Sequence, residues 1–472
     1  MTARQSFVED PARAAADALA TLSAALGDRQ ATVDELRVPR RPFPSAFDVT
    51  AMATATVAAA TSAVASWLEL HEGRRRAVVI DGLHVAAAFA SERHLTPRGW
   101  TLPSPWDPFA GDYPAADGFV RLHTNYSYHR DAALRALGVS PDRDVLARAV
   151  ALRSRVEVEG AVVAAGGCAA AMHDAVAWDT HPAGRAVGSE PLVACWTRAE
   201  VAPGSFAGAI SAARPLASVR VLDLTRVIAG PVATRFLAAY GAQVLRLDPP
   251  GFVEVPALLP ETTAGKRCAS LDLKSEEGRG RFDALLAEAD VLVHGLRRGA
   301  LRALGYSPDH LQTRFPRLVV AGVNAYGVSG PWALRRGFDS LVQMSTGIAA
   351  RGMNVSGAAT PVPLPVQALD HGTGYLLASA IIQALRRRAE LGWVDEIHVS
   401  LARTAAWLTS LGVANSIVGT PLQNDEVRPH LEEANSAWGP LERVRCPGTL
   451  EGVPTRWTLE PGPLGRSGAT WE

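Results

Sequence analysis

The spacing of apolar residues in the second half of this 472-residue chain changes repeatedly between the two-residue period of strands and the longer period of helices. Residues 219–224 (Val-Arg-Val-Leu-Asp-Leu) and 243–247 (Gln-Val-Leu-Arg-Leu) predict two strands joined by a helix over 232–240. Further strands are expected at 291–294 and 318–323, again with helical patterns between them. This alternation predicts an α/β fold with a mostly parallel sheet and right-handed crossovers.

Two Ala-rich tracts, 48–90 and 370–407, share one plan. Each begins with Asp, continues as a long helical pattern, and passes through a polar break and a short strand (78–81 and 397–400) into another apolar helix. This order predicts a partial internal duplication. The identities are few and Ala-rich helices also resemble each other by composition alone, so both interpretations stay open.

The 472 residues exceed one typical domain, so more than one domain is expected, and the scattered cysteines favour a reduced, cytoplasmic compartment. Forty-seven acidic and 47 basic residues leave no net charge to attract nucleic acid or an anionic membrane. The four cysteines, Cys168, Cys195, Cys268 and Cys446, lie far apart in the sequence, so neither a metal site nor a disulfide framework is expected. The N-terminus lacks the pattern of a signal peptide, and the apolar run 51–70 is broken by Thr and Ser, so we expect no membrane segment.

The first strand-to-helix turn, residues 223–231 (Asp-Leu-Thr-Arg-Val-Ile-Ala-Gly-Pro), leads directly into a helix N-terminus. Free backbone N–H groups and the helix dipole favour an anion at such a place, although every α/β sheet contains similar turns. The turn lacks the G-x-G-x-x-G pattern, which disfavours a nicotinamide-dependent oxidoreductase.

Asp370 is the candidate with the most chemical interest. It lies in the segment 365–375 (Pro-Val-Gln-Ala-Leu-Asp-His-Gly-Thr-Gly-Tyr), at the start of a long helical pattern. A carboxylate there acts either as a helix cap or as a nucleophile, and a carboxylate nucleophile needs a partly desolvated, oriented setting. The residues His371, Gly372, Thr373 and Gly374 offer backbone N–H groups for an oxyanion, and His371 also has a side chain that can orient the carboxylate.

Eight short motifs occur in a characteristic order and together cover about 190 residues. They are residues 221–231, 240–251, 265–274, 289–293, 296–299, 326–331, 336–339 and 369–374. This order resembles the class III CoA-transferase family (CaiB/BaiF), which includes formyl-CoA, carnitine-CoA and succinyl-CoA transferases and α-methylacyl-CoA racemase. The resemblance implies a Rossmann-like parallel-sheet large domain and a smaller α+β domain.

The resemblance also implies a function. Asp370 would attack an acyl-CoA thioester to form a mixed anhydride, and the CoA would pass to a small carboxylic acid. Acyl-CoA is then a substrate, with no tightly bound cofactor and no metal. The residues implied in CoA binding are Thr225, Arg226, Val227, Ile228, Ala229, Lys266, Arg267, Arg297 and Arg336.

Three departures from the family pattern keep alternatives open. Family members often carry Asn-Phe-Arg-Pro-Gly where this chain has residues 295–299 (Gly-Leu-Arg-Arg-Gly), and often a basic residue where it has 248–250 (Asp-Pro-Pro). The racemase branch has a histidine where this chain has Phe338, which argues against two-base proton transfer. The alternatives are an acyl-CoA racemase, isomerase or lyase of the same fold, or a non-catalytic CoA-binding protein.

The order of segments suggests a partial family copy placed before a large domain. We expect residues 1–200 to hold this copy (a helix–strand repeat at 48–93 and a small-domain-like part at 100–200), followed by a linker over 201–218. Residues 219–415 are then the Rossmann-like CoA-binding and catalytic domain, and 416–472 a C-terminal return segment. The resemblance implies either a homodimer or a fused monomer that completes its own site. Asp48, the counterpart of Asp370, lacks the following Gly-x-Gly and is expected to be structural.

Overall fold

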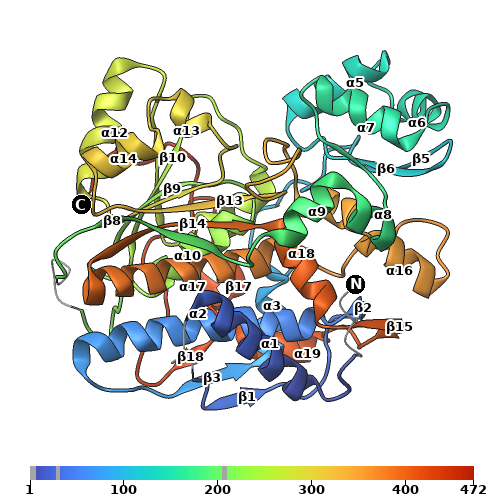
Figure 1. The fold of residues 1–472 in the computed structure, drawn as a ribbon. Helices are drawn as coiled ribbons and strands as arrows, with labels where there is room; N and C mark the ends of the chain where they lie inside the picture. Colours follow the sequence, from blue (N-terminus) through green and yellow to red (C-terminus); the bar gives the residue numbers. More distant parts are fainter. Residues whose placement is uncertain (1–6, 28–31, 205–209, 472) are drawn as a thin grey trace.

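A seven-stranded sheet forms the centre of the protein (Figure 1). The computed structural model describes residues 7–27, 32–204 and 210–471. The strands, in spatial order, are β11 (Lys266–Ser270), β10 (Gln243–Asp248), β9 (Arg220–Leu224), β12 (Val291–His294), β13 (Val319–Asn324), β14 (Trp393–Ser400) and β8 (Ala194–Glu200). The first six run parallel and β8 pairs antiparallel with β14, so the prediction of a mostly parallel sheet is confirmed.

The strand order reverses between β9 and β12. β9 comes first in the chain among the parallel strands, the next two extend the sheet on one side, and the later three extend it on the other. Loops that leave β9 and β12 therefore diverge at their carboxyl ends, which leaves a crevice between them. Such a reversal is where ligands bind in open α/β sheets.

Helices cover both faces of the sheet. α12 (Glu276–Glu288), α13 (Ala300–Ala303) and α14 (Pro308–Arg314) lie on one face, and α10 (Ala229–Ala239) and α17 (Ala368–Leu391) lie on the other (Figure 1). Each face has its own hydrophobic cluster: Leu222 and Leu292 pack toward α12, while Val221 and Val293 pack toward α17. This alternation along β9 and β12 is what a sheet buried on both sides requires.

α17 is buried along most of its length because a further helical layer lies beyond it. α2 (Val49–Glu72) packs along α17, and α1 (Pro11–Leu26) packs on α2 (Figure 1). By length and composition α2 is apolar enough to cross a membrane, but 94% of its most apolar stretch is buried inside the protein. Burial in the core on all sides explains why this helix is apolar all round.

α2 and α17 have similar surroundings in the chain. Both contain 24 residues and both end at a glycine with positive φ, Gly73 (68°) and Gly392 (75°). α2 leads to β3 (Val78–Asp81) and α3 (Gly82–Ala88), as α17 leads to β14 and α18 (Leu401–Ser410). The shared order matches the predicted plan, and the duplication itself stays a prediction.

A smaller unit stands beside the carboxyl edge of the sheet (Figure 1). β5 (Gly111–Ala115), β6 (Gly118–Leu122) and β7 (Ala169–Ala171) form an antiparallel sheet, and three helices pack on it: α5 (Ser127–Leu137), α6 (Arg143–Ala151) and α7 (Arg155–Ala164). Its core is separate from the two large clusters and is built around Val120, Leu146 and Val158.

The tract before residue 201 does not fold as a unit apart from the tract after residue 218. β8 is an edge strand of the central sheet, and the residues of α2 belong to the same hydrophobic cluster as those of α17. In the C-terminal segment, β17 (Leu441–Val444) pairs with β4 (Thr96–Pro97) and β18 (Thr449–Leu450) pairs with β3. The expected linker over 201–218 therefore does not separate two hydrophobic cores, and residues 205–209 of it lie outside the described residues.

The remaining elements connect these layers. They are β1 (Glu35–Arg37), β2 (Ser45–Phe47), α4 (Ser91–His94), α8 (Ala175–Thr180), α9 (Pro182–Ser189), α11 (Leu259–Thr262), α15 (Asp339–Ser345), α16 (Ile348–Ser356), β15 (Val413–Val418), α19 (Asn424–Val427) and β16 (Leu431–Ala434), with short 3-10 turns at Pro256–Leu258 and Arg428–His430.

Candidate active site

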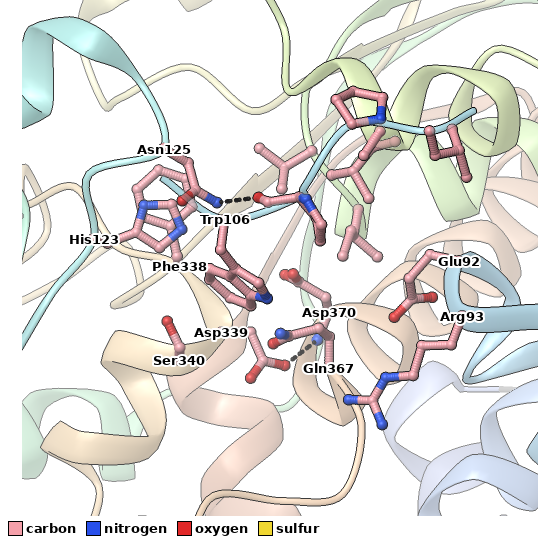
Figure 2. Close-up of a pocket in the computed structure, with 17 residues that line it drawn as sticks. Glu92, Arg93, Trp106, His123, Asn125, Phe338, Asp339, Ser340, Gln367 and Asp370 are labelled. Atoms are coloured by element: carbon pink, nitrogen blue, oxygen red, sulfur yellow. Dashed lines mark hydrogen bonds between the residues drawn. The ribbon is translucent and has the colours of Figure 1, made fainter. Parts of the chain in front are cut away.

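Asp370 lies in the first turn of α17, but another residue caps this helix. The Asp339 carboxylate accepts hydrogen bonds from the backbone N–H groups of Leu369 (2.9 Å) and Asp370 (3.0 Å), and it also accepts one from the Gln343 amide. Figure 2 shows the Asp339 side chain bonded to the start of the helix. Among the described residues, none donates a hydrogen bond to the Asp370 carboxylate. Its side chain is therefore left available for another role.

The surroundings of Asp370 disfavour its ionised form. The residue is 7% exposed. Burial raises the pKa of the Asp370 carboxyl well above its usual range, and the neighbouring carboxylates of Asp339 and Glu92 raise it further. Burial likewise raises the pKa of Asp339 to about 6. A carboxylate with little solvent and few hydrogen bonds is a stronger nucleophile than one in water.

Two cavities meet at Asp370. The first, called here the apolar cavity, has a volume of about 260 Å³ and is lined mainly by apolar side chains, including Leu102, Trp106, Leu258 and Phe338 (Figure 2). The second, called here the arginine cavity, has a volume of about 480 Å³ and opens at the carboxyl ends of β9, β12 and β13. Asp370 lines both cavities, so a group bound in either one can reach its carboxylate.

The arginine cavity brings together most of the residues expected to bind CoA. Its lining includes Thr225, Arg226, Val227, Ile228, Ala229, Arg297 and Arg336. It lies at the sheet reversal between β9 and β12, as the topology leads one to expect. Arg335, which the sequence did not single out, is a further cationic residue of this lining.

Val227 marks the border between the two cavities. It has a φ of 63°, a left-handed conformation that is strained for a β-branched residue, and its N–H donates to Glu254 (3.1 Å). Val227 and Ile228 line both cavities. Such strain, of the order of 1–3 kcal/mol, is retained where the surrounding structure fixes the backbone, often at functional sites.

Lys266 and Arg267 lie elsewhere, so the expectation that they hold CoA is corrected here. The Lys266 ammonium is fully buried and donates to Asp223 (3.0 Å) and to the Pro231 carbonyl (3.3 Å). Arg267 donates to the carbonyl of Thr470 (2.6 Å). Neither residue lines the two cavities. Strand β11, which carries both, is an edge strand of the sheet, and these two side chains bond to the core and to the C-terminal segment.

The sequence model of the family described as CoA-transferase family III matches residues 216–448. Over these residues the chain belongs to CoA-transferase family III. The match begins just before β9 and includes Asp370 and all the described strands and helices that form the arginine cavity from the sheet side.

Curated relatives agree with this assignment. A probable fatty acyl-CoA transferase of Mycobacterium tuberculosis is 32% identical over 209 residues, which are 42% of this chain and 52% of that protein. Formyl-CoA:oxalate CoA-transferase of Escherichia coli is 29% identical over 200 residues, 40% of this chain and 47% of its own length. The chain thus spans about half the length of the curated relatives it matches. A solved CaiB/BaiF family structure from Brucella suis is 26% identical, with a TM-score of 0.37, and the match covers 48% of this chain and 65% of the other.

The family III region does not close the site alone. Glu92, Trp106, His123 and Asn125 line the apolar cavity, and all of them precede residue 216. Tyr126, Tyr128 and His129, at the start of α5, line the arginine cavity in the same way. The sequence predicts that the loop 100–113, which includes Trp106, shapes the pocket, whereas the other residues of this tract were not singled out.

The Gly-x-Gly after Asp370 serves packing. A Cβ atom at Gly374 would lie 2.6 Å from the Ala229 carbonyl oxygen, so this glycine lets α17 approach α10 closely. The backbone N–H groups of the first turn are already bonded, since Leu369 and Asp370 donate to Asp339 and His371 donates to the Gln367 carbonyl (3.1 Å). Of the expected oxyanion donors, residues 371–374, the N–H group of His371 is therefore already used within the helix.

His371 is bonded to a neighbour from the N-terminal tract. Its Nε2 atom lies 3.1 Å from Glu92 Oε2, and its ring stacks near Phe89. The histidine is 1% exposed and lines neither cavity. It holds Glu92 at the wall of the apolar cavity, so its contribution to the site is indirect.

Asp48 has different surroundings from Asp370. Its carboxylate accepts from the Ala51 N–H (3.0 Å) and from the Arg41 guanidinium (2.9 and 3.1 Å), and it is 2% exposed. It lines neither of the two cavities at Asp370. In this position Asp48 caps α2 and pairs with a buried cation.

Proposed function

We propose that the protein is an acyl-CoA:carboxylate CoA-transferase that uses Asp370 as its nucleophile. The observation that carries this proposal is the position of Asp370. The carboxylate is buried, receives no hydrogen bond from a described residue, and lies where the apolar and arginine cavities meet. The apolar cavity suits an acyl group, and the arginine cavity suits the anionic CoA moiety.

The chemistry requires several steps at one carboxylate. Asp370 attacks the thioester carbonyl carbon, the carbon–sulfur bond breaks, and an aspartyl-acyl anhydride and a CoA thiolate result. For CoA to reach a second acid, the thiolate attacks the aspartyl carbonyl and releases the donor acid, which leaves Asp370 as a CoA thioester. The acceptor carboxylate then attacks this thioester, and the thiolate attacks the acceptor carbonyl of the new anhydride, which restores the Asp370 carboxylate.

The residues around Asp370 support these steps in two ways. Asp339 fixes the start of α17, so the nucleophile keeps one orientation, and the apolar lining limits the access of water that would hydrolyse the anhydride. Arg297 and Arg336 supply positive charge on the CoA side.

A trapping experiment tests the proposal. The protein is incubated with an acyl-CoA series and hydroxylamine, which converts an aspartyl anhydride or thioester into a hydroxamate, and peptides are then analysed by mass spectrometry. We expect a hydroxamate on Asp370 and a release of free acid that requires the Asp370 carboxylate. Asp370→Asn is the matched control. Transfer of CoA that survives in Asp370→Asn would refute the mechanism.

A second candidate function rests on His123. Its ring stacks on Phe338 with centroids 3.6 Å apart, and it lines the apolar cavity together with Asp370. A histidine from the N-terminal tract thus faces the acyl side although residue 338 itself is Phe. Proton transfer at the α-carbon of an acyl-CoA by Asp370 and His123 would appear as deuterium uptake in heavy water without CoA release. Burial lowers the pKa of His123 to about 3, which makes it a weak base and favours the transferase.

We also infer that one chain completes its own site. Glu92, Trp106 and Tyr128 come from the tract before residue 216, whereas Asp370 and Arg297 come from the family III region. All of them line the two cavities within a single chain. Light scattering combined with turnover measured over a range of protein concentrations tests this, and a specific activity that falls on dilution would contradict it.

A further inference from the structure

A third cavity lies at the open edge of the sheet. It has a volume of about 530 Å³ and is called here the edge cavity. Strands β12, β13, β14 and β8 form its floor through His294, Gly322, His398 and Trp196, and Arg302 of α13 contributes to its wall. Its volume is in the range of a ligand site.

The edge cavity continues from the arginine cavity. Leu296, Arg297, Val323 and Asn324 line both of them, so the two cavities are adjacent, and the arginine cavity reaches Asp370. Arg297 stands at the junction. A long ligand whose reacting end is at Asp370 can therefore extend through the arginine cavity into the edge cavity.

The charge of the edge cavity favours an anion. Four arginines line it, Arg198, Arg297, Arg298 and Arg302, against a single acid, Glu396, which is bonded to His398 (3.1 Å). Arg198 and Arg298 donate to backbone carbonyls (2.6 and 2.8 Å), and the charge of Glu396 acts on Arg198. No described residue pairs with the side chains of Arg297 and Arg302.

The floor of the edge cavity offers a flat aromatic surface. The Trp196 indole stacks on the His398 imidazole with centroids 5.3 Å apart and planes 9° apart, and Trp196 is 44% exposed. Gly322 makes this possible, because a Cβ atom there would lie 2.7 Å from His398 Nδ1. A stacked, partly exposed indole is a surface on which a nucleobase binds.

Two polar atoms in the lining of this cavity, Arg198 Nη2 and His294 Nδ1, have no hydrogen-bond partner within the described part of the protein. Both atoms are buried. Buried polar atoms are nearly always paired, so an unpaired one in a cavity wall indicates a place for a ligand atom or a water molecule. The aromatic surface, the arginines and these two nitrogens together describe a ligand with an aromatic base and several anionic groups.

Resting on the function proposed above, we propose that the edge cavity binds the adenosine phosphate end of the acyl-CoA. The base stacks on Trp196, the phosphates lie among Arg297, Arg298 and Arg302, and the pantetheine arm runs through the arginine cavity to Asp370. The Trp196 position belongs to β8, outside the family III region, so the nucleotide is held by both parts of the chain.

Calorimetric titration of the 472-residue chain tests this assignment with two probes, CoA and pantetheine, which lacks the nucleotide. Trp196→Ala is compared with Trp393→Ala, an indole of similar exposure (43%) that does not line the edge cavity. We expect Trp196→Ala to weaken CoA binding by about fivefold or more, the size of one stacking contact, and to leave pantetheine binding unchanged. Trp393→Ala should match the wild type with both probes.

A charge variant gives an independent measurement. Arg302→Gln should weaken CoA binding about tenfold and reduce its salt dependence, while Arg314→Gln, an exposed arginine of α14 outside the cavity, should not. Thermal melting of each variant establishes that it is folded. Wild-type CoA affinity in both Trp196→Ala and Arg302→Gln overturns the assignment, even if Asp370 forms its acyl adduct. If the wild type itself binds no CoA, the assignment and the proposed function fail together.

Discussion

Asp370→Asn should make the protein more stable at neutral and alkaline pH while it abolishes CoA transfer. The carboxylate is buried beside Asp339 and Glu92, and all three effects raise its pKa. A carboxyl group with a raised pKa binds its proton more tightly in the folded state than in the unfolded state. The protonated Asp370 carboxyl therefore contributes its full stabilisation at pH values below its pKa in the unfolded chain. This stabilisation is lost as the pH rises through its pKa in the folded protein.

The size of this change in stability follows from the coupling between proton binding and folding. Each pKa unit by which the folded value exceeds the unfolded value removes about 1.4 kcal/mol of stability once the pH is above both. Asp339, for which the rise is from 3.8 to about 6, shows the scale in the same site, about 3 kcal/mol. The raised pKa of Asp370 moves its own loss of stability to pH values above the usual range of a carboxyl group.

Urea unfolding at a series of pH values between 4 and 9 measures this. We expect Asp370→Asn to equal the wild type near pH 4 and to exceed it by about 1.4 kcal/mol or more at pH 9. Asp309→Asn, an exposed carboxylate in the first turn of α14, is the control and should show no such pH dependence. Equal stability of Asp370→Asn and the wild type at pH 9 would show that the carboxylate is well solvated, and the argument for an activated nucleophile would fail.

Three further variants separate structural from chemical roles. Asp48→Ala leaves the buried Arg41 unpaired, so it should lower the free energy of unfolding by about 3 kcal/mol without changing turnover per folded molecule; lost turnover in a fully folded variant would contradict the structural assignment. Trp106→Ala enlarges the apolar cavity and should shift the ratio of kcat/KM toward bulkier acyl groups by about tenfold, and an unchanged ratio across an acyl-CoA series would remove Trp106 from the acyl site. Lys266→Met leaves Asp223 without its cation and should reduce stability by about 3 kcal/mol with an unchanged Kd for CoA, whereas a weakened Kd in the folded variant would restore Lys266 as a CoA ligand.

The central sheet could be predicted because its evidence is local. Each parallel strand is a short apolar run next to a helical pattern, and β9 with its loop into α10 follows the expected order. The pairing of β8 with β14 could not be predicted in this way, because residues 194–200 are largely exposed and their partner lies almost 200 positions later. Strand pairing over such distances depends on tertiary contacts that one sequence does not display.

In the site, too, local features could be predicted from the sequence, whereas contacts between distant residues could not. Thr225 to Ala229 share the arginine cavity with Asp370 because the loop after β9 is set by the sheet. Lys266 was misassigned because a motif position does not show where a side chain points, and this one is directed at a buried carboxylate. Asp339 illustrates the opposite error: its motif was visible, but the cap it makes with α17 joins residues 30 positions apart and becomes evident only in the structure.

The two aspartates at the starts of α2 and α17 show how similar sequence patterns acquire different chemistry. At α2, Asp48 itself accepts a backbone N–H, from Ala51, and pairs with Arg41, so its charge is satisfied and its side chain is fixed. At α17, the capping bonds come from Asp339, and no cation stands next to Asp370 among the described residues. The capping requirement of the helix is met in both cases, but only at α17 is it met by a second residue. If Asp370 is the nucleophile proposed above, its release from capping and from solvent is what activates it, and the energetic cost is a fold that is less stable at pH values above the pKa of Asp370.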